Sequence, residues 1–252
     1  MIISHQKKFV FLRTGKTASS SIEVFLSQFC STGDTITPLG TFASDDEDKF
    51  KEKHDLLCAQ NYILKKKSFG IKNFLNFNFY NKVHVNSHDS IDKVLKTEIG
   101  NKIKDYFFFC FIRNPFDWIV RCFWWYIYLK KYNRNIDWIN NLNKNELNKI
   151  FKRFLDEESY NYFAKQEDII TNKNVNINIY KYEDLEENIK VIKKKLDLKE
   201  EKILLKDIRF KKLKIERNIS IDKKDEKKIF ESGEFFFNKY YNNTTLPSKY
   251  KN

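Results

Sequence analysis

The sequence predicts an α/β fold in which a central parallel sheet is covered by helices on both faces. Short unbroken apolar runs, typical of strands buried on both faces, alternate with segments whose apolar residues recur every three or four positions, typical of helices. This alternation indicates strand–helix–strand units with parallel strands. We expect residues 1–252 to form a single domain, since α/β chains of about 200–250 residues commonly build one core.

The chain opens with one such unit. Residues 9–12 are apolar and predict a strand, and an apolar stripe predicts a helix over residues 22–29. The polar segment 13–21 joins them. Residues 31–80 are less regular, and we interpret them as an insertion that is mobile or faces the substrate.

The middle of the chain holds the most apolar strand. Residues 106–112 predict a central strand, and 83–85 a second, shorter one. A helix is expected over residues 91–99, ended by Gly100. Asn114-Pro115 predicts the start of another helix, because Asn caps the first turn and Pro suits the first helical position.

The remaining elements follow the same alternation. Helical stripes predict helices over residues 147–154 and 185–196, and alternating apolar residues predict a strand over 175–179. Apolar residues between 229 and 240 predict a last packed helix.

Composition excludes several classes of protein. With 41% hydrophobic residues the chain can bury a core, and no apolar run approaches the length of a membrane helix. The N-terminus lacks a signal-peptide pattern, so we expect a soluble, cytoplasmic protein. The net charge of +13 accompanies many Lys and Asn and only 6 Gly, which resembles the codon bias of an AT-rich genome. We therefore interpret the charge mainly as lysines on solvated faces that select no partner; an anionic small ligand is the alternative, and no nucleic acid is expected.

The cysteines do not indicate a cofactor. The four cysteines contain no C-x-x-C pair, so reduced structural thiols are expected, with no disulfide and no metal site. His84 and His88 have the spacing of a metal-binding pair, but no third ligand lies nearby in the sequence.

The segment after the first strand has the composition of a phosphate-binding loop. Small residues let backbone N–H groups approach an anion, the helix dipole favours negative charge, and a lysine adds a point charge. The candidate ligand-binding residues are Arg13, Gly15, Lys16, Thr17, Ala18, Ser19, Ser20 and Ser21. An ATPase loop would need glycine where Val10 stands. A merely structural, serine-rich helix cap is the alternative.

A second anion site is predicted at the end of the most apolar strand. Arg113 follows that strand directly, and an unpaired buried guanidinium is costly. Arg113 therefore holds either a phosphate or, alternatively, a buried carboxylate.

Together these segments resemble the sulfotransferases that use 3′-phosphoadenosine 5′-phosphosulfate (PAPS), especially the carbohydrate-type branch. Residues 16–22, KTASSSI, resemble the family's 5′-phosphosulfate loop, and residues 113–117, RNPFD, its 3′-phosphate motif. Residues 180–185, YKYEDL, resemble a further strand-to-helix piece of the family. The resemblance implies a P-loop-like three-layer fold and sulfuryl transfer from PAPS to a hydroxyl of a glycan, lipid or small metabolite, without a metal.

The sequence departs from the family pattern at two positions. Arg121 stands where a serine usually helps to bind the 3′-phosphate, and Trp118 where a basic residue is frequent. Arginine also binds phosphate, so Arg121 either replaces the serine contact or marks a weakened site. A nucleotide-binding relative without catalysis, or a kinase-like phosphoryl transferase, is therefore an alternative function.

Transfer to a hydroxyl needs a cation beside the leaving oxygen and a base for the acceptor. Lys16 fits the first role by its place in the loop. His88 is the expected base, because it follows a predicted strand and resembles the family's histidine segment. His84 and Glu23 are the alternatives, and a helix cap or surface histidine is the structural interpretation of His88.

Overall fold

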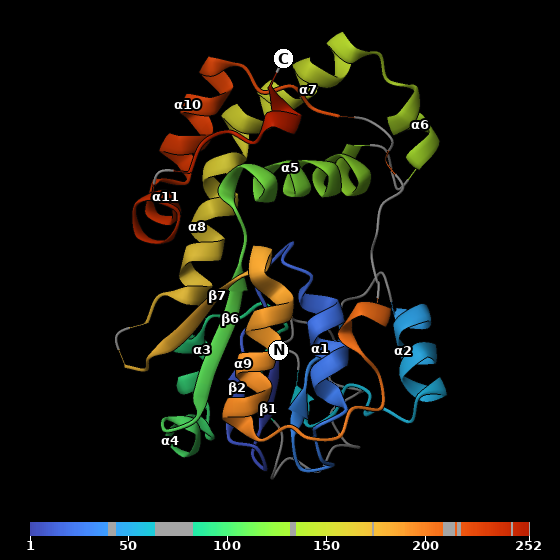
Figure 1. Ribbon diagram of the computed structural model, residues 1–252, viewed down its shortest axis with the longest axis vertical. Coiled ribbons are helices and arrows are strands. Elements are labelled where there is room, and N and C mark those ends of the chain that lie inside the picture. Colours follow the sequence, from blue (N-terminus) through green and yellow to red (C-terminus); the bar gives the residue numbers. More distant parts are fainter. Residues whose placement is uncertain are drawn as a thin grey trace, which may run out of the picture.

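The computed structural model describes residues 1–39, 44–63, 83–131, 135–172, 174–208, 215, 218–242 and 244–251. These residues form a mixed α/β structure with a central sheet flanked by helices (Figure 1). The five strands of that sheet are, in spatial order, β3 (Thr35–Ile36), β1 (Ile2–Ser4), β2 (Phe9–Phe11), β6 (Phe107–Ile112) and β7 (Ile177–Lys181).

The sheet is parallel only in part. β2, β6 and β7 are parallel neighbours, as predicted, with Val10 opposite Phe108 and Cys110 opposite Ile179. β1 runs antiparallel to both β2 and β3, so the expectation of a wholly parallel sheet is wrong at this edge. The cause is the short turn between β1 and β2, where Lys8 takes a left-handed φ of 52° and returns the chain beside itself.

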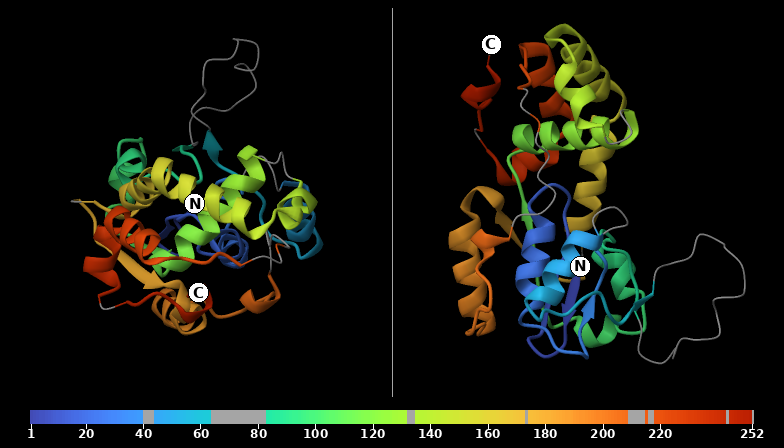
Figure 2. Two further views of the ribbon diagram at one scale, coloured as in Figure 1. Left: turned by 90° about the horizontal axis from the view of Figure 1, so that it is seen from above. Right: turned by 90° about the vertical axis from the view of Figure 1, so that its right-hand side faces the viewer.

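Side chains of the strands alternate between two cores. Phe9 and Phe11 of β2 face helices α1 (Ser19–Ser27) and α9 (Leu185–Leu196), whereas Val10 belongs to the opposite cluster. That opposite face carries α3 (Ile91–Leu95) and α4 (Gly100–Ile103). The right-hand view of Figure 2 shows the helices on the two sides of the sheet, so the molecule has three layers here.

Of two local predictions in this region, the short strand is confirmed and the helix end at Gly100 is wrong. The strand predicted at 83–85 is β5 (Val83–His84), which pairs with β4 (Tyr62–Ile63) in a separate two-stranded sheet. Gly100 begins α4 instead of ending a long helix. A Cβ atom on Gly100 would lie 2.0 Å from the Leu95 carbonyl oxygen, so glycine allows this close approach of the backbone.

The segment predicted as an insertion contributes to the core where it is described. It supplies β3 to the central sheet and α2 (Ser44–Lys53), while its residues 40–43 and 64–80 lie outside the described residues. Asp34, just before β3, is fully buried and accepts hydrogen bonds from the Ser4 hydroxyl and the His5 N–H.

A layer of helices lies beyond the carboxyl end of β6 (Figure 1). It contains α5 (Pro115–Tyr126), the π-helical turn η3 (Ile127–Lys131), α6 (Ile136–Asn141), α7 (Lys144–Glu157), α8 (Ser159–Ile170), α10 (Lys223–Ser232) and α11 (Glu234–Tyr240). The predicted helices near 22–29, 115, 147–154 and 185–196 are confirmed, and the predicted last helix is two helices separated at Gly233. Short 3-10 turns complete the chain: η4 (Tyr182–Asp184), η5 (Leu205–Asp207) and η6 (Ser248–Tyr250).

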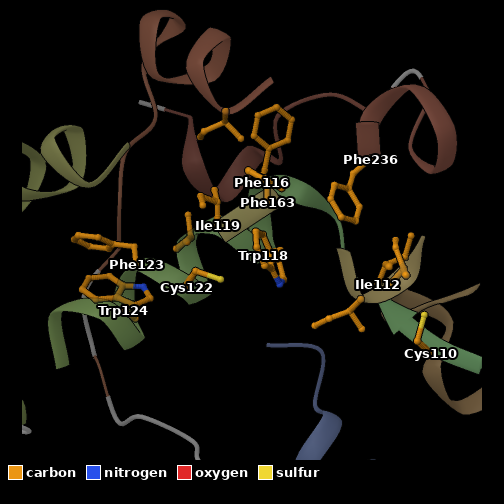
Figure 3. Packing of buried hydrophobic residues seen from close by; sticks show 14 of the residues in the cluster. Cys110, Ile112, Phe116, Trp118, Ile119, Cys122, Phe123, Trp124, Phe163 and Phe236 are labelled. Carbon is orange, nitrogen blue, oxygen red and sulfur yellow. The ribbon is translucent and has the colours of Figure 1, made fainter. Parts of the chain in front are cut away.

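The core of this helical layer is aromatic. Phe116, Phe123 and Trp124 of α5 are buried (Figure 3). The ring of Phe123 contacts the rings of Phe151 and Phe154 on α7. Cys110 and Cys122 are buried, and Cys30 is partly buried; the thiols of these three cysteines are free. Among the described residues, no helix is long and apolar enough to cross a bilayer.

Candidate functional site

The loop between β2 and α1 is a tight strand-to-helix connection. Lys16 and Ala18 have left-handed φ values of 58° and 57°, which turn the chain sharply between strand and helix. The Thr14 hydroxyl lies 2.8 Å from the Thr17 hydroxyl and braces the turn from inside. Ala18 is the N-cap of α1 and offers no side-chain hydrogen bond, so no cap covers the first amides of that helix. The positive end of α1 therefore remains available to an anion.

The structure brings the loop and Arg113 to the same edge of the sheet. β2 and β6 are adjacent and parallel, and Lys16 and Arg113 follow their carboxyl ends. The Thr14 hydroxyl donates to the Phe111 carbonyl at 2.5 Å, and the Trp118 indole N–H donates to the Gly15 carbonyl at 2.7 Å. In Figure 3 the indole nitrogen of Trp118 points toward the blue segment that carries this loop.

The positive charges of Lys16 and Arg113 both affect the Cys122 thiol. Burial raises the pKa of the Cys122 thiol, and the positive charges of Lys16 and Arg113 both oppose that rise. Two cations therefore lie within electrostatic reach of one buried sulfur on α5.

Arg113 is mostly buried but has spare donor capacity. Its guanidinium lies over the Tyr182 ring at 4.4 Å, and Nη2 is 4.0 Å from Asp117 Oδ2. Its Nε is buried and has no hydrogen-bond partner among the described residues. A buried, unpaired N–H of a charged group is costly, so an anion at this point would satisfy it.

The strand-to-helix piece 180–185 supports this arginine. Tyr182 supplies the ring under the guanidinium, and Glu183 accepts from the Asn114 backbone N–H and from the Tyr241 hydroxyl, both at 2.7 Å. Asn114 caps α5 by accepting from the N–H groups of the next turn, as predicted. Glu183 therefore acts as a structural anchor of the motif.

Arg121 lies on the surface of α5, near the C-terminal turn η6. Arg121 is exposed. Burial and the hydrogen bond to Asp117 raise the pKa of the Tyr250 hydroxyl, and the positive charges of Arg121 and Arg113 oppose this rise. Tyr250 and Lys249 both contact Asp117 Oδ1, at 2.7 and 2.6 Å. Arg121 thus shares a neighbourhood with Arg113.

Arg13, predicted to contact the ligand, points into the protein. It is 2% exposed, donates to the Ser20 hydroxyl at 2.7 Å and to the Leu39 carbonyl at 3.0 Å, and lies 3.8 Å from Glu23. The fully buried Glu23 accepts from the Met1 amino group, which removes it as a candidate base. Burial beside a carboxylate explains the orientation of Arg13, which supports the loop from behind.

The structure places His88 beside the loop. Its Nδ1 lies 2.7 Å from the Arg13 carbonyl oxygen. Because a carbonyl only accepts, Nδ1 carries the proton, and Nε2 of the neutral ring is left as the acceptor. Although part of the residue is exposed, desolvation of the ring and the Arg13 charge lower the pKa of His88 to about 4. The imidazole is therefore neutral at pH 7. His84 is exposed on β5.

Three residues contact the loop that the sequence analysis did not assign to it. Gln166 of α8, 4% exposed, accepts from the Gly15 N–H at 3.0 Å. The Trp118 indole N–H donates to the Gly15 carbonyl, so tryptophan has a structural role at a position where a basic residue is frequent in the family. Trp125 lies under Lys16, with the ammonium 3.5 Å from the ring centroid. The i, i+7 spacing of Trp118 and Trp125 indicated a common helix face, but not that this face meets the loop.

One of the comparisons with known proteins found a match. The model of one family, described as the sulfotransferase family, matches residues 1–237, which is nearly the whole chain. No curated protein and no solved structure matches the chain. Among the described residues, no group of three His, Cys, Asp or Glu side chains could hold a metal ion.

Proposed function

Since this chain belongs to the sulfotransferase family, we propose that it transfers a sulfuryl group from PAPS to an acceptor hydroxyl. In this proposal the loop at residues 15–21 binds the 5′-phosphosulfate, and Arg113 binds the 3′-phosphate. The observation that carries it is the position of Lys16 and Arg113 at the ends of two adjacent parallel strands.

The residues present suit such a nucleotide. The uncapped N-terminus of α1 and the left-handed turn at Lys16 and Ala18 form a P-loop-like anion site. The unpaired Arg113 Nε offers a donor to the second phosphate. Arg121 is a further candidate for that phosphate, because its charge acts in the same neighbourhood. The hydroxyl of Ser20 is already bonded to Arg13, so we assign it a supporting role.

PAPS supplies the sulfuryl group, which leaves its phosphate oxygen as the acceptor oxygen attacks sulfur from the opposite side. Lys16 places a positive charge where negative charge develops on the leaving oxygen. His88 accepts the acceptor's proton on Nε2, and the Arg13 carbonyl holds its Nδ1–H and so keeps the ring in the correct tautomer.

Titration with the product 3′-phosphoadenosine 5′-phosphate (PAP) tests the proposal, with ATP as the comparison. We expect heat of binding with PAP and much weaker binding of ATP, followed by sulfate transfer from PAPS to a member of a hydroxyl acceptor panel. No binding of PAP would overturn the proposal. Binding of PAP without transfer to any acceptor would identify a nucleotide-binding relative that does not catalyse, and preferential ATP binding a kinase-like enzyme.

A further inference from the structure

One face of α5 forms the seat of the lysine loop. Trp118, Cys122 and Trp125 are spaced i, i+4, i+7 and therefore lie along one side of the helix. Trp118 donates to the Gly15 carbonyl, Cys122 lies within reach of the Lys16 charge, and Trp125 lies under the Lys16 ammonium. Three successive positions on one helix face thus follow the course of the loop.

We propose that Trp125 is a positioning residue for Lys16, an inference that rests on the proposed role of Lys16 in sulfuryl transfer. The ammonium lies 3.5 Å from the centroid of the Trp125 ring, well within the range of a cation–π contact. The ring itself is braced by Tyr128, whose ring centroid is 5.7 Å away. The adjacent Trp124 is different, because it is buried in the aromatic core against Phe123 (Figure 3).

An aromatic ring suits this role better than a carboxylate. A carboxylate would hold the ammonium but also neutralise it and occupy its N–H donors. The face of a tryptophan ring orients the ammonium without neutralising its positive charge, which can then act on the leaving oxygen. The left-handed backbone of Lys16 fixes the start of the side chain, and Trp125 fixes its end. The flexible stem between them then samples few other positions.

The first test compares Trp125→Leu, which removes the π face, with Trp125→Phe, which keeps a smaller one. Trp138→Leu is the matched control, since Trp138 lies on α6 and is 62% exposed. For Trp125→Leu we expect kcat to fall about 2- to 30-fold, the range of a cation–π contact, with an unchanged dissociation constant for PAP. Trp125→Phe should recover most of the loss. An unchanged kcat in Trp125→Leu, or equal losses in kcat and PAP affinity, would overturn the proposal.

A double-mutant cycle with Lys16→Met isolates the pair. If Trp125 acts through Lys16, Trp125→Leu has no further effect on kcat once Lys16 is methionine. Additive effects would show that Trp125 acts by another route and would overturn the proposal.

A spectroscopic test distinguishes failure of this inference from failure of the proposed function. Lysines are reductively dimethylated with 13C-formaldehyde and a borane or cyanoborohydride reductant, and the Lys16 signal is identified by its loss in Lys16→Met. We expect ring current from Trp125 to move that signal upfield in the wild type but not in Trp125→Leu. This shift in a protein that binds no PAP would support the contact while refuting sulfotransfer. Its absence from the wild type would refute the contact whatever the enzyme does.

Discussion

Replacement of Arg113 by methionine tests whether this residue binds the 3′-phosphate end of the nucleotide and not its 5′ end. The side chain of Arg113 is 14% exposed, and its Nε has no partner among the described residues. Hydrogen bonds to charged groups contribute about 1.5–3 kcal/mol. Loss of one such bond to the 3′-phosphate should therefore weaken PAP binding about 10- to 150-fold.

The fold should survive this change. Asp117, which lies 4.0 Å from Arg113, keeps the Lys249 ammonium at 2.6 Å and the Tyr250 hydroxyl at 2.7 Å. An ion pair at that distance contributes little to stability. Thermal unfolding of the variant checks this point. Arg153→Met is the matched control, because Arg153 lies on α7, pairs with Glu157, and has a side chain that is 71% exposed.

The assay is calorimetric titration with PAP and with AMP, which lacks the 3′-phosphate. We expect Arg113→Met to weaken PAP binding by the factor above and to leave AMP binding unchanged. Equal losses for the two nucleotides would mean that Arg113 acts on the shape of the whole site. Unchanged PAP binding in a folded variant would refute its assignment to the 3′-phosphate.

Three further predictions concern the proposed base His88, the structural anchor Glu183 and the helix cap Asp222. His88→Gln should abolish transfer and leave PAP affinity intact. In the wild type, kcat should fall on the acid side near pH 4, the pKa of His88; a fall near pH 6.5 would contradict this. Since this pKa is below the unfolded value of 6.5, the unfolded state binds the proton first, and the free energy of unfolding should decrease as pH falls from 6.5 toward 4. Urea unfolding should show this decrease in the wild type and not in His88→Gln. Glu183→Gln, which weakens the anchor of Asn114 and Tyr241, should reduce affinity for PAP but not for AMP in the same titrations. Asp222→Ala removes the N-cap of α10 and should lower the free energy of unfolding at pH 7 by about 1 kcal/mol, measured by urea unfolding. The pKa of Asp222 is lowered to about 2, chiefly by its hydrogen bond from Lys152. The difference in stability between wild type and variant should therefore shrink as pH falls from 3.8 toward 2.

Features that depend on neighbouring residues could be predicted from the sequence. The start of α5 follows from Asn114-Pro115, since capping and the fixed φ of proline act within one turn. β6 follows from an unbroken apolar run, because it is buried on both faces. β1 was missed because three residues hold too little pattern, and its direction depends on the turn that joins it to β2.

Features that depend on distant partners could not be predicted. Arg13 was expected to face the ligand, but its partners Leu39 and Glu23 turn it inward. Trp124 and Trp125 are adjacent in the sequence, yet one enters the core and the other lies under Lys16. Only the packing of α5 over the loop separates their roles, and no local pattern reports that packing.

The central claim is that Lys16 and Arg113 hold opposite ends of one nucleotide. The 31P NMR spectrum of bound PAP tests it most directly, because the 5′- and 3′-phosphates have separate signals. We predict that Lys16→Met shifts the 5′ signal alone and that Arg113→Met shifts the 3′ signal alone. Two variants that shift the same signal, or that shift neither, would contradict the claim.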